Sequence, residues 1–286
     1  MQPIEALGEI NICFAVDDNY APYLKVTINS IIRNCDRNRK LDIIVLCKGL
    51  SDKNMETVKS VSDNNSNVSI RFVDVSETVQ DISYSIGGYL TEATMYRLFI
   101  LSDLFKNYDR IIYLDADTIV EGDISELFFT DMDGKPVAAV EDTGLRQLAF
   151  SKRAVFIDGR IPYSINGYKK NALEMKSPEC YFNAGVILFD LKKYRERHSF
   201  EEVLAIKEAK HYFYNDQDIL NILFDAEVYM LDFGWNYQNN IDGWCKMRPE
   251  VYESMFADAR REHPMIIHYV SAHKPWNDEV TWGGNI

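Results

Sequence analysis

Two aspartates, Asp115 and Asp117, follow a strongly apolar stretch, Arg110–Leu114. Such a stretch predicts a buried strand, which would hold both carboxylates where the strand ends rather than on a loose loop. Alternate positions of an extended segment face one side, so the pair offers hard oxygen ligands to a divalent cation. The competing interpretation is a solvated strand end that caps a turn before Thr118, and the two-aspartate pattern alone does not separate the two.

A histidine and a lysine near the C-terminus extend this pattern. His268 follows the apolar segment PMII, and imidazole is a common ligand for Mn²⁺-like ions in sites of mixed nitrogen and oxygen donors. Otherwise a lone histidine at a strand end is usually a hydrogen-bonding residue. Lys274 comes six residues later and precedes Pro275 and Trp276. A lysine on such a stiffened loop beside a metal ligand can neutralise a phosphate.

The first predicted strand, 10–16, ends in the polar residues Asp17, Asp18, Asn19 and Tyr20. Neither GxGxxG nor GxxxxGK[ST] occurs there or elsewhere, which disfavours a dinucleotide and a P-loop nucleotide. Carboxylate and amide groups suit the polar edge of a base and a ribose, and Tyr20 can stack on the base. An Asx-rich turn explains the same residues equally well.

Three further segments place polar or small residues inside or at the ends of predicted elements: Asp216-Gln217-Asp218, Arg97 and Asn183-Ala184-Gly185. Asp216 opens a helix, where an aspartate is often an N-cap. Arg97 lies in an apolar helix and is expected to make an ionic contact, with an exposed helix face as the alternative. Ala184 and Gly185 would let a ligand approach the backbone, although core packing explains them nearly as well.

Strands and helices alternate along the part of the chain that must position these residues. Strands are predicted at 10–16, 41–47, 68–75, 110–114, 137–140, 186–189, 227–232 and 265–269. Helices are predicted at 22–34, 51–64 and 91–104. This order predicts an α/β fold with a mainly parallel, helix-covered sheet, in which ligands bind at the carboxyl ends of the strands. The polar, Lys-rich segment 146–179 is predicted to form a lid over the core.

Composition bounds the functions that this chain can have. Of 286 residues, 47% are hydrophobic, enough for a large core, and we expect one core with an appendage. Against 31 basic residues stand 44 acidic ones, and a net charge of −13 repels nucleic acid. An anionic ligand can therefore bind only where a metal or a few lysines and arginines concentrate positive charge.

Location is predicted from the apolar runs and the cysteines. The longest apolar run within one element, Ala184–Phe189, is far shorter than the ~20 residues of a membrane-spanning helix. The N-terminus has no basic region before its apolar run, so a secreted precursor is not expected. Five cysteines without a CxxC pattern suit a reducing cytosol. We therefore expect a cytoplasmic protein.

Six segments, in this order, resemble the motifs of glycosyltransferase family 8: FAVDDNYAPYL, ATMYRLFI, IIYLDADTIV, YFNAGVILFDLKKYR, NDQDILN and IIHYVSAHKPW. The likeness spans about Phe14 to Trp276, nearly the whole chain. This family comprises retaining transferases, among them bacterial lipopolysaccharide galactosyl- and glucosyltransferases and glycogenin. The resemblance implies a GT-A type fold, a UDP-sugar donor such as UDP-galactose or UDP-glucose, and a divalent ion, Mn²⁺ or Mg²⁺.

The resemblance also implies roles for individual residues. The metal would be held by Asp115, Asp117 and His268. The diphosphate would meet Lys274. The uracil and ribose would contact Ala15, Asp17, Asn19 and Tyr20. The donor sugar would be surrounded by Arg97, Asp115, Asn183, Ala184, Asp216 and Gln217, with Gln217 nearest the anomeric carbon. Asp142, in AAVED, would lie toward the acceptor.

This sequence differs from the common family pattern at two places. Ser271 stands where members commonly have the glycine of HxxGxxKPW, at a donor-binding position. Its amide can still donate, but its side chain takes space beside the phosphate and sugar. Members also often carry a basic, aromatic C-terminal tail that touches membranes, and none follows Trp276 in this sequence. Peripheral membrane contact therefore stays an open expectation.

The expected function is metal-dependent, retaining transfer of galactose or glucose from a UDP-sugar to a saccharide or other hydroxyl acceptor. We expect a single domain, 1–286, with a nucleotide-binding half at about 10–120 and an acceptor or lid half at about 121–286. An amide oxygen is a weak nucleophile, so Gln217 is expected to stabilise an oxocarbenium-like centre during front-face attack, with Asp216 as the reserve nucleophile. The acceptor and the oligomeric state are not predicted.

Two alternatives stay open. A non-catalytic UDP-sugar-binding protein of the same fold is suggested by Ser271. A haloacid-dehalogenase-like phosphatase would use Asp115 as its nucleophile, because Asp115-Ala-Asp117-Thr118 is similar to the DxDxT motif of those enzymes. In those phosphatases the aspartate normally follows the first strand, whereas three predicted strands precede it here.

Overall fold

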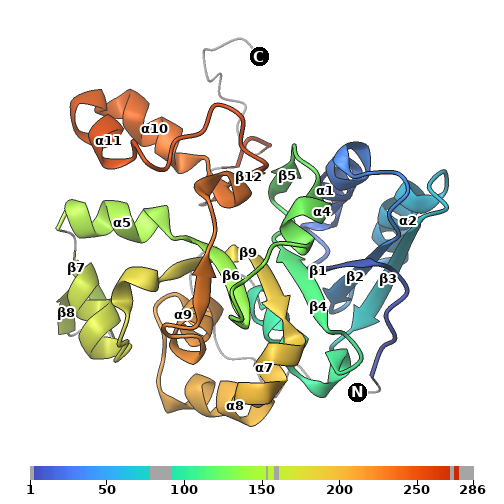
Figure 1. Ribbon diagram of the computed structural model, residues 1–286, viewed down its shortest axis with the longest axis horizontal. Coiled ribbons are helices and arrows are strands. Elements are labelled where there is room, and N and C mark those ends of the chain that lie inside the picture. The colour runs from blue at the N-terminus through green and yellow to red at the C-terminus, as the bar shows by residue number, and fades with distance from the viewer. Residues whose placement is uncertain (1–2, 78–91, 153, 158–160, 271–273, 277–286) are drawn as a thin grey trace.

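The centre of the molecule is a seven-stranded sheet in the order β10-β6-β9-β4-β1-β2-β3 (Figure 1). The computed structural model describes residues 3–77, 92–152, 154–157, 161–270 and 274–276. The strands of the sheet are β1 Ile10–Val16, β2 Leu41–Cys47, β3 Val68–Asp74, β4 Arg110–Leu114, β6 Val137–Glu141, β9 Phe182–Asp190 and β10 Val228–Met230. β9 is antiparallel to both neighbours, and the other adjacent pairs are parallel. The predicted mixed, mainly parallel sheet is confirmed.

Helices cover both faces of this sheet because its strands are apolar on both sides. The covering helices are α1 Ala21–Asn34, α2 Asp52–Lys59, α4 Ile124–Phe128, α7 Leu191–Arg197, α8 Phe200–Ala209 and α9 Asn215–Leu223. In β1, Ile12 and Phe14 pack into the core that contains α1, α2 and α4. Cys13 points to the opposite core, formed with α7, α8 and α9. Burial of each large apolar side chain stabilises the fold by roughly 1.5–3 kcal/mol.

The helix predicted over 91–104 is wrong in its extent. The described part, from residue 92, consists of α3 Ala93–Tyr96 and two 3₁₀ turns, Arg97–Leu101 and Asp103–Phe105. Ser102, between the turns, has an extended backbone, and its hydroxyl accepts the Leu104 N–H at 3.3 Å. A serine in this role interrupts helical hydrogen bonding. The helix predicted at 51–64 also ends early, at Lys59.

A small second sheet joins the C-terminal part of the chain to the turn after β4. It contains β5 Thr118–Val120, β11 Tyr237–Gln238 and β12 Ile266–His268, in the order β11-β12-β5. β12 is antiparallel to β5, and its register places His268 opposite Thr118. Residues separated by 150 positions in the chain therefore meet beside the Asp115–Asp117 turn.

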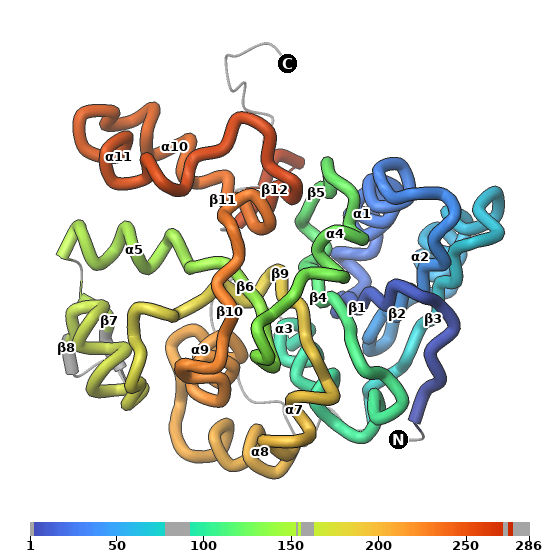
Figure 2. The backbone as a smooth tube through the Cα atoms, viewed as in Figure 1, coloured from blue at the N-terminus to red at the C-terminus, as the bar shows by residue number. Residues whose placement is uncertain are grey.

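The predicted lid region forms a lobe on one side of the sheet. It contains α5 Thr143–Phe150, the hairpin of β7 Ala154–Ile157 and β8 Ile161–Ser164, α6 Ile165–Gly167 and the π-helical turn Tyr168–Ala172. A second pair of helices, α10 Asn240–Met247 and α11 Pro249–Met255, lies beside α5 (Figure 2). The Gln147 amide nitrogen donates to the Tyr252 hydroxyl at 3.0 Å and joins α5 to α11. The described helices include no segment with the length and hydropathy of a bilayer span.

Candidate active site

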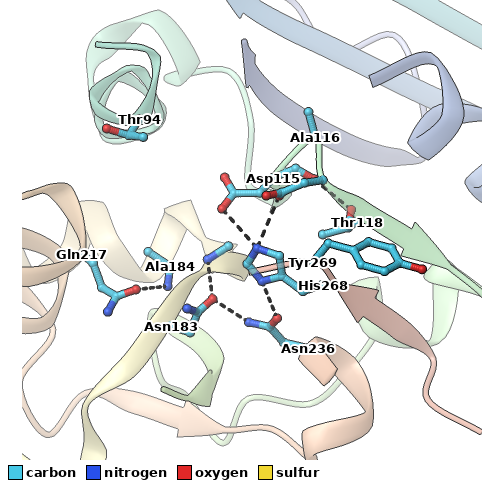
Figure 3. Close-up of polar contacts among 12 residues, drawn as sticks. Thr94, Asp115, Ala116, Thr118, Asn183, Ala184, Gln217, Asn236, His268 and Tyr269 are labelled. Carbon is cyan, nitrogen blue, oxygen red and sulfur yellow. Dashed lines mark hydrogen bonds and ion pairs between the residues drawn. The ribbon is translucent and has the colours of Figure 1, made fainter. Parts of the chain in front are cut away.

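Asp115 and Asp117 lie in a turn between β4 and β5, so the predicted extended geometry is wrong. The Thr118 hydroxyl donates to the backbone oxygen of Asp115 at 2.9 Å and closes this turn. The chain must turn here because β5 leaves the large sheet to pair with β12. Both carboxylates nevertheless face the same point, where His268 lies (Figure 3).

The imidazole of His268 completes a cluster of three side chains that could hold a metal ion. Its Nε2 lies 3.7 Å from Asp115 Oδ2 and 3.4 Å from Asp117 Oδ1, and one donor atom from each residue lies within 4.8 Å of the other two. His268 is buried, and its Nδ1 contacts Asn236 Oδ1 at 2.9 Å. Two carboxylate oxygens and an imidazole nitrogen, converging in a buried pocket, are a donor set that fits a Mn²⁺-like divalent cation.

Gly185 in β9 leaves the space that this cluster occupies. A Cβ at this position would lie 2.1 Å from His268 Cε1 and 2.8 Å from Asp115 Oδ2. The sequence indicated that a small residue here lets something approach the backbone. The structure shows that the side chains making this approach are those of the cluster itself.

Lys274 brings a positive charge to the cluster. Its ammonium group donates to an Asp117 carboxylate oxygen and, at 2.6 Å, to the backbone oxygen of Tyr269. Burial alone would raise the pKa of Asp117, but His268 and Lys274 outweigh it and hold this pKa well below its ordinary value. Trp276 stacks on Tyr23 of α1 with ring centroids 4.0 Å apart and anchors the segment that carries Lys274.

Arg97 makes the ionic contact that the sequence predicts and joins two carboxylates. Its guanidinium lies 3.0 Å from Asp115 Oδ1 and 2.9 Å from Asp216 Oδ2, and it also donates to the backbone oxygen of Ala184. The Tyr113 ring lies under it, 4.5 Å from the guanidinium carbon. Burial raises the pKa of Asp216 to about 6 even with Arg97 beside it. Asp216 therefore ion-pairs instead of acting as the N-cap of α9.

The amide of Gln217 is held at both ends. Its Oε1 accepts the Ala184 N–H at 3.0 Å, and its Nε2 donates to Asp142 Oδ2 at 3.0 Å. Asp142 is buried and also caps α5, because its other oxygen accepts the Leu145 N–H at 2.8 Å. These contacts fix the amide relative to the sheet and to the start of the lobe.

A cavity of about 330 Å³ connects these groups. Six of the predicted site residues that line it come from the N-terminal half: Ala15, Asp17, Tyr20, Arg97, Asp115 and Asp117. Seven come from the C-terminal half: Asp142, Asn183, Ala184, Asp216, Gln217, His268 and Lys274.

Two predicted site residues are not placed in this cavity. Asn19 is exposed, and its N–H donates to Asp17 Oδ1 at 3.0 Å, which is the Asx turn that the sequence offered as the alternative. Asp17 and Tyr20 nevertheless line the cavity. Burial and the nearby aspartates raise the pKa of Tyr20 to about 12. Ser271 lies outside the described residues.

Several residues at the site were missed from the sequence. Asn236 is fully buried beside His268, and Gln238 is buried where its Oε1 accepts the backbone N–H and hydroxyl of Thr143. The only signal available was a pair of amides in an aromatic segment, FGWNYQ. Leu145 and Leu148 of α5 line the cavity on the side of Asp142, and apolar residues at helical spacing do not distinguish a ligand wall from a core.

Sequence comparisons place this chain among glycosyltransferases. Lipopolysaccharide 1,2-glucosyltransferase of Escherichia coli (strain K12) is 27% identical over 274 residues, which cover 94% of this chain and 73% of that protein. General stress protein A of Bacillus subtilis (strain 168) is 27% identical over 277 residues, covering 95% of this chain and 88% of that protein.

Solved structures share the fold. The WbbM bifunctional glycosyltransferase aligns with a TM-score of 0.81 and 33% identity over 96% of this chain, which spans about half of that protein (48%). The galactosyltransferase LgtC, solved with donor and acceptor sugar analogs, aligns with a TM-score of 0.69 and 27% identity over 96% of this chain and 92% of LgtC. The predicted GT-A type fold is confirmed by this likeness. Residues 11–280 match the family described as Glycosyl transferase family 8, and the chain belongs to that family.

Proposed function

We propose that this protein is a retaining hexosyltransferase that moves galactose or glucose from a UDP-sugar to a hydroxyl of a saccharide or other acceptor. The observation that supports this most strongly is the cluster of Asp115, Asp117 and His268 in the cavity, next to Lys274. In a chain of net charge −13, this arrangement can concentrate positive charge for a diphosphate. A bound Mn²⁺ or Mg²⁺ would stabilise the negative charge that develops on the leaving UDP.

The nucleoside would bind at the end of β1. We assign the uracil and ribose to Ala15, Asp17 and Tyr20, which line the cavity beside the metal cluster. Tyr20 is half-buried and presents an aromatic ring, so a base can stack on it. Asn19 and Ser271 stay predictions for the donor site.

The donor sugar would lie between Arg97, Asn183, Ala184, Asp216 and Gln217. Since both ends of the Gln217 amide are hydrogen-bonded, it acts as a fixed dipole beside the anomeric carbon and not as a nucleophile. The acceptor oxygen attacks that carbon from the side of the leaving group. The bond to the UDP oxygen breaks with its electron pair on UDP, and the acceptor proton passes to the departing phosphate.

Asp216 is the residue that could replace this route by a covalent one. It is ion-paired with Arg97 and largely ionised at neutral pH, since its pKa is raised only to about 6. Mass spectrometry of the protein after incubation with UDP-galactose or UDP-glucose would detect a hexose on Asp216. We expect none, and an adduct there would replace front-face attack by double displacement.

Slow donor hydrolysis tests the proposed activity without knowledge of the acceptor. With Mn²⁺ and UDP-galactose or UDP-glucose, we expect release of UDP that depends on Asp117. Binding of UDP without any turnover on either donor would favour the non-catalytic alternative. No observation favours the phosphatase alternative, because Asp115 is held by Arg97 and by the Tyr113 hydroxyl, at 2.7 Å.

We also propose that residues 1–286 act as one transferase domain. The large sheet takes β1 to β4 from the predicted nucleotide-binding half and β6, β9 and β10 from the other half. A cytoplasmic location is proposed on the five free cysteines, four of which are buried.

A further inference from the structure

Four buried side chains form a continuous line of hydrogen bonds from the start of α5 to the metal cluster. Asn183 Nδ2 donates to Asp142 Oδ2 at 3.0 Å, and Asn236 Nδ2 donates to Asn183 Oδ1 at 2.9 Å. Asn236 Oδ1 then contacts His268 Nδ1 at 2.9 Å. All four residues are at most 9% exposed, so these groups have little access to water that could replace their partners. Figure 3 shows the part of this line from Asn183 to His268.

The direction of each hydrogen bond follows from the groups at its ends. The Gly185 backbone N–H can only donate, and it donates to Asn183 Oδ1 at 3.0 Å. The Asp142 carboxylate can only accept, so Asn183 Nδ2 must point toward it. Asn236 must therefore present its Nδ2 to Asn183, which leaves its Oδ1 facing His268.

An amide oxygen beside Nδ1 can be satisfied only if His268 carries a proton on Nδ1. The neutral imidazole then has its free electron pair on Nε2, the nitrogen that faces Asp115 and Asp117. That is the tautomer required of a ligand that binds through Nε2. With the opposite orientation of Asn236, its NH₂ group would favour the proton on Nε2, where it would block a cation.

We infer that Asn183 and Asn236 are positioning residues that transmit the fixed orientation of Asp142 to His268 and hold its proton on Nδ1. Asp142 also anchors Gln217, so one carboxylate orients both the amide proposed to face the sugar and the imidazole proposed to face the metal. The inference rests on the proposed function only for the identity of the cation.

The test combines a spectrum of the metal-free protein with metal affinity. In protein with ¹⁵N-labelled histidine, treated with EDTA and kept at alkaline pH, long-range ¹H–¹⁵N correlations report which imidazole nitrogen carries the proton. A His268→Gln variant identifies the signals. Calorimetry with Mn²⁺ alone gives the affinity.

Wild-type His268 is expected in the Nδ1–H form. Asn236→Ala should give a mixture of tautomers and weaken Mn²⁺ binding by about 10- to 100-fold, the usual effect of losing a group that supports a metal ligand. Asn183→Ala should have the same two effects to a smaller extent, because the Asn236 amide could then rotate and present its NH₂ group to His268. Asn236→Asp keeps an acceptor beside Nδ1 and should retain the Nδ1–H form.

Asn11→Ala is the matched control. Asn11 is also buried, but its amide donates to the backbone oxygen of Arg110, at the other end of the strands. This variant should lose stability without changing the His268 signals. If Asn236→Ala does not fold, Asn183→Ala and Asn236→Asp carry the test.

The inference would be overturned if the spectrum of wild type placed the His268 proton on Nε2. It would also be overturned if both alanine variants kept the wild-type tautomer and the wild-type Mn²⁺ affinity. The proposed function fails separately. If wild type binds no Mn²⁺ while the alanine variants lose the Nδ1–H form, the positioning role of Asn183 and Asn236 is supported. The proposed metal-dependent activity is then contradicted.

Discussion

Two regions of the molecule bury carboxylates in opposite ways. In the cluster edge, formed by the Asp115–Asp117 turn with Arg97, His268 and Lys274, the carboxylates face guanidinium, imidazole and ammonium groups. In the α5 lobe, formed by residues 143–172 with α10 and α11, the carboxylate that ties the lobe to α9 is Asp218. It accepts the hydroxyls of Tyr168 and Tyr181 at 2.5 and 2.6 Å and the Tyr214 N–H at 2.7 Å.

The pKa directions express this contrast. Cationic neighbours hold the pKa of Asp117 well below its ordinary value, whereas burial raises the pKa of Asp218 to about 6 despite its three hydrogen bonds. Charged partners therefore surround the carboxylates of the cluster edge. Asp218 is held by neutral hydroxyl and N–H donors, whereas Arg146 of α5 ion-pairs with Glu141 and Asp258.

Removal of Asp117 should give the largest effect. Asp117→Ala deletes one ligand and leaves Lys274 without its carboxylate, so Mn²⁺ affinity should fall by at least about 100-fold, and Mn²⁺-dependent UDP affinity should fall with it. Calorimetry measures both. Asp123→Ala is the control, because Asp123 caps α4 and should cost about 1 kcal/mol of stability without changing either affinity. Unchanged UDP affinity in Asp117→Ala would contradict the proposal that a cation held by Asp117 contributes to UDP binding.

Filling the space at Gly185 should disturb the cluster edge nearly as much. Gly185→Ala forces His268 and Asp115 apart, so we expect a loss of about 10- to 100-fold in Mn²⁺ affinity and about 1–3 kcal/mol in stability. Gly243→Ala in α10 is the matched control, since an added Cβ there meets no atom within 4 Å. Equal behaviour of the two variants would contradict the packing argument.

The two regions should respond differently to acid. Asp218 has a pKa of about 6 in the folded protein against an ordinary value of 3.8, so the folded state binds the extra proton between these values. The stability that this proton contributes is present below pH 4 and is lost as the pH rises through 6. As the pH falls from above 6 to below 4, the free energy of unfolding of wild type should increase relative to that of Asp218→Asn by up to roughly 3 kcal/mol. Urea unfolding at several pH values measures this difference.

The contribution of Asp117 has the opposite sign. Its pKa is depressed in the folded state, so the stability it contributes is present above its ordinary value of 3.8 and is lost as the pH falls below it. A difference between wild type and Asp218→Asn that does not change with pH would contradict the buried, neutral environment assigned to Asp218.

The smallest effects are expected from two Tyr→Phe substitutions, one in each region, that each remove a single hydroxyl group. Tyr113→Phe removes the hydroxyl that donates to Asp115 at 2.7 Å and should weaken Mn²⁺ binding by about tenfold. Tyr168→Phe removes a hydroxyl from Asp218 and should cost about 1–2 kcal/mol of stability with Mn²⁺ and UDP affinities unchanged. Weaker Mn²⁺ binding in Tyr168→Phe would mean that the two regions are not independent.

The parts of the fold and site that could be predicted are those that depend on local sequence. β1, β2 and β4 begin and end as expected because each is a continuous apolar run closed by polar residues. The motifs singled out the three residues of the Asp115, Asp117 and His268 cluster, although Asp115 and His268 are far apart in the chain. The antiparallel pairing of β12 with β5, in the small second sheet, then brings them together.

The rest depends on packing that no local pattern encodes. The turn at Asp117 follows from the pairing of β5 with β12, a contact between distant segments. Gly185 and Asn236 gain their meaning only when β9 and β12 approach the same point. In the α5 lobe, apolar spacing in α5 predicts a buried face but not that Leu148 borders a cavity.

Calorimetric titration of UDP into the protein, with and without Mn²⁺, tests the central claim most directly. We expect UDP binding to appear or tighten strongly when Mn²⁺ is present, and we expect Asp117→Ala to abolish this dependence. An absence of UDP binding under both conditions would contradict the donor site at the Asp115, Asp117 and His268 cluster.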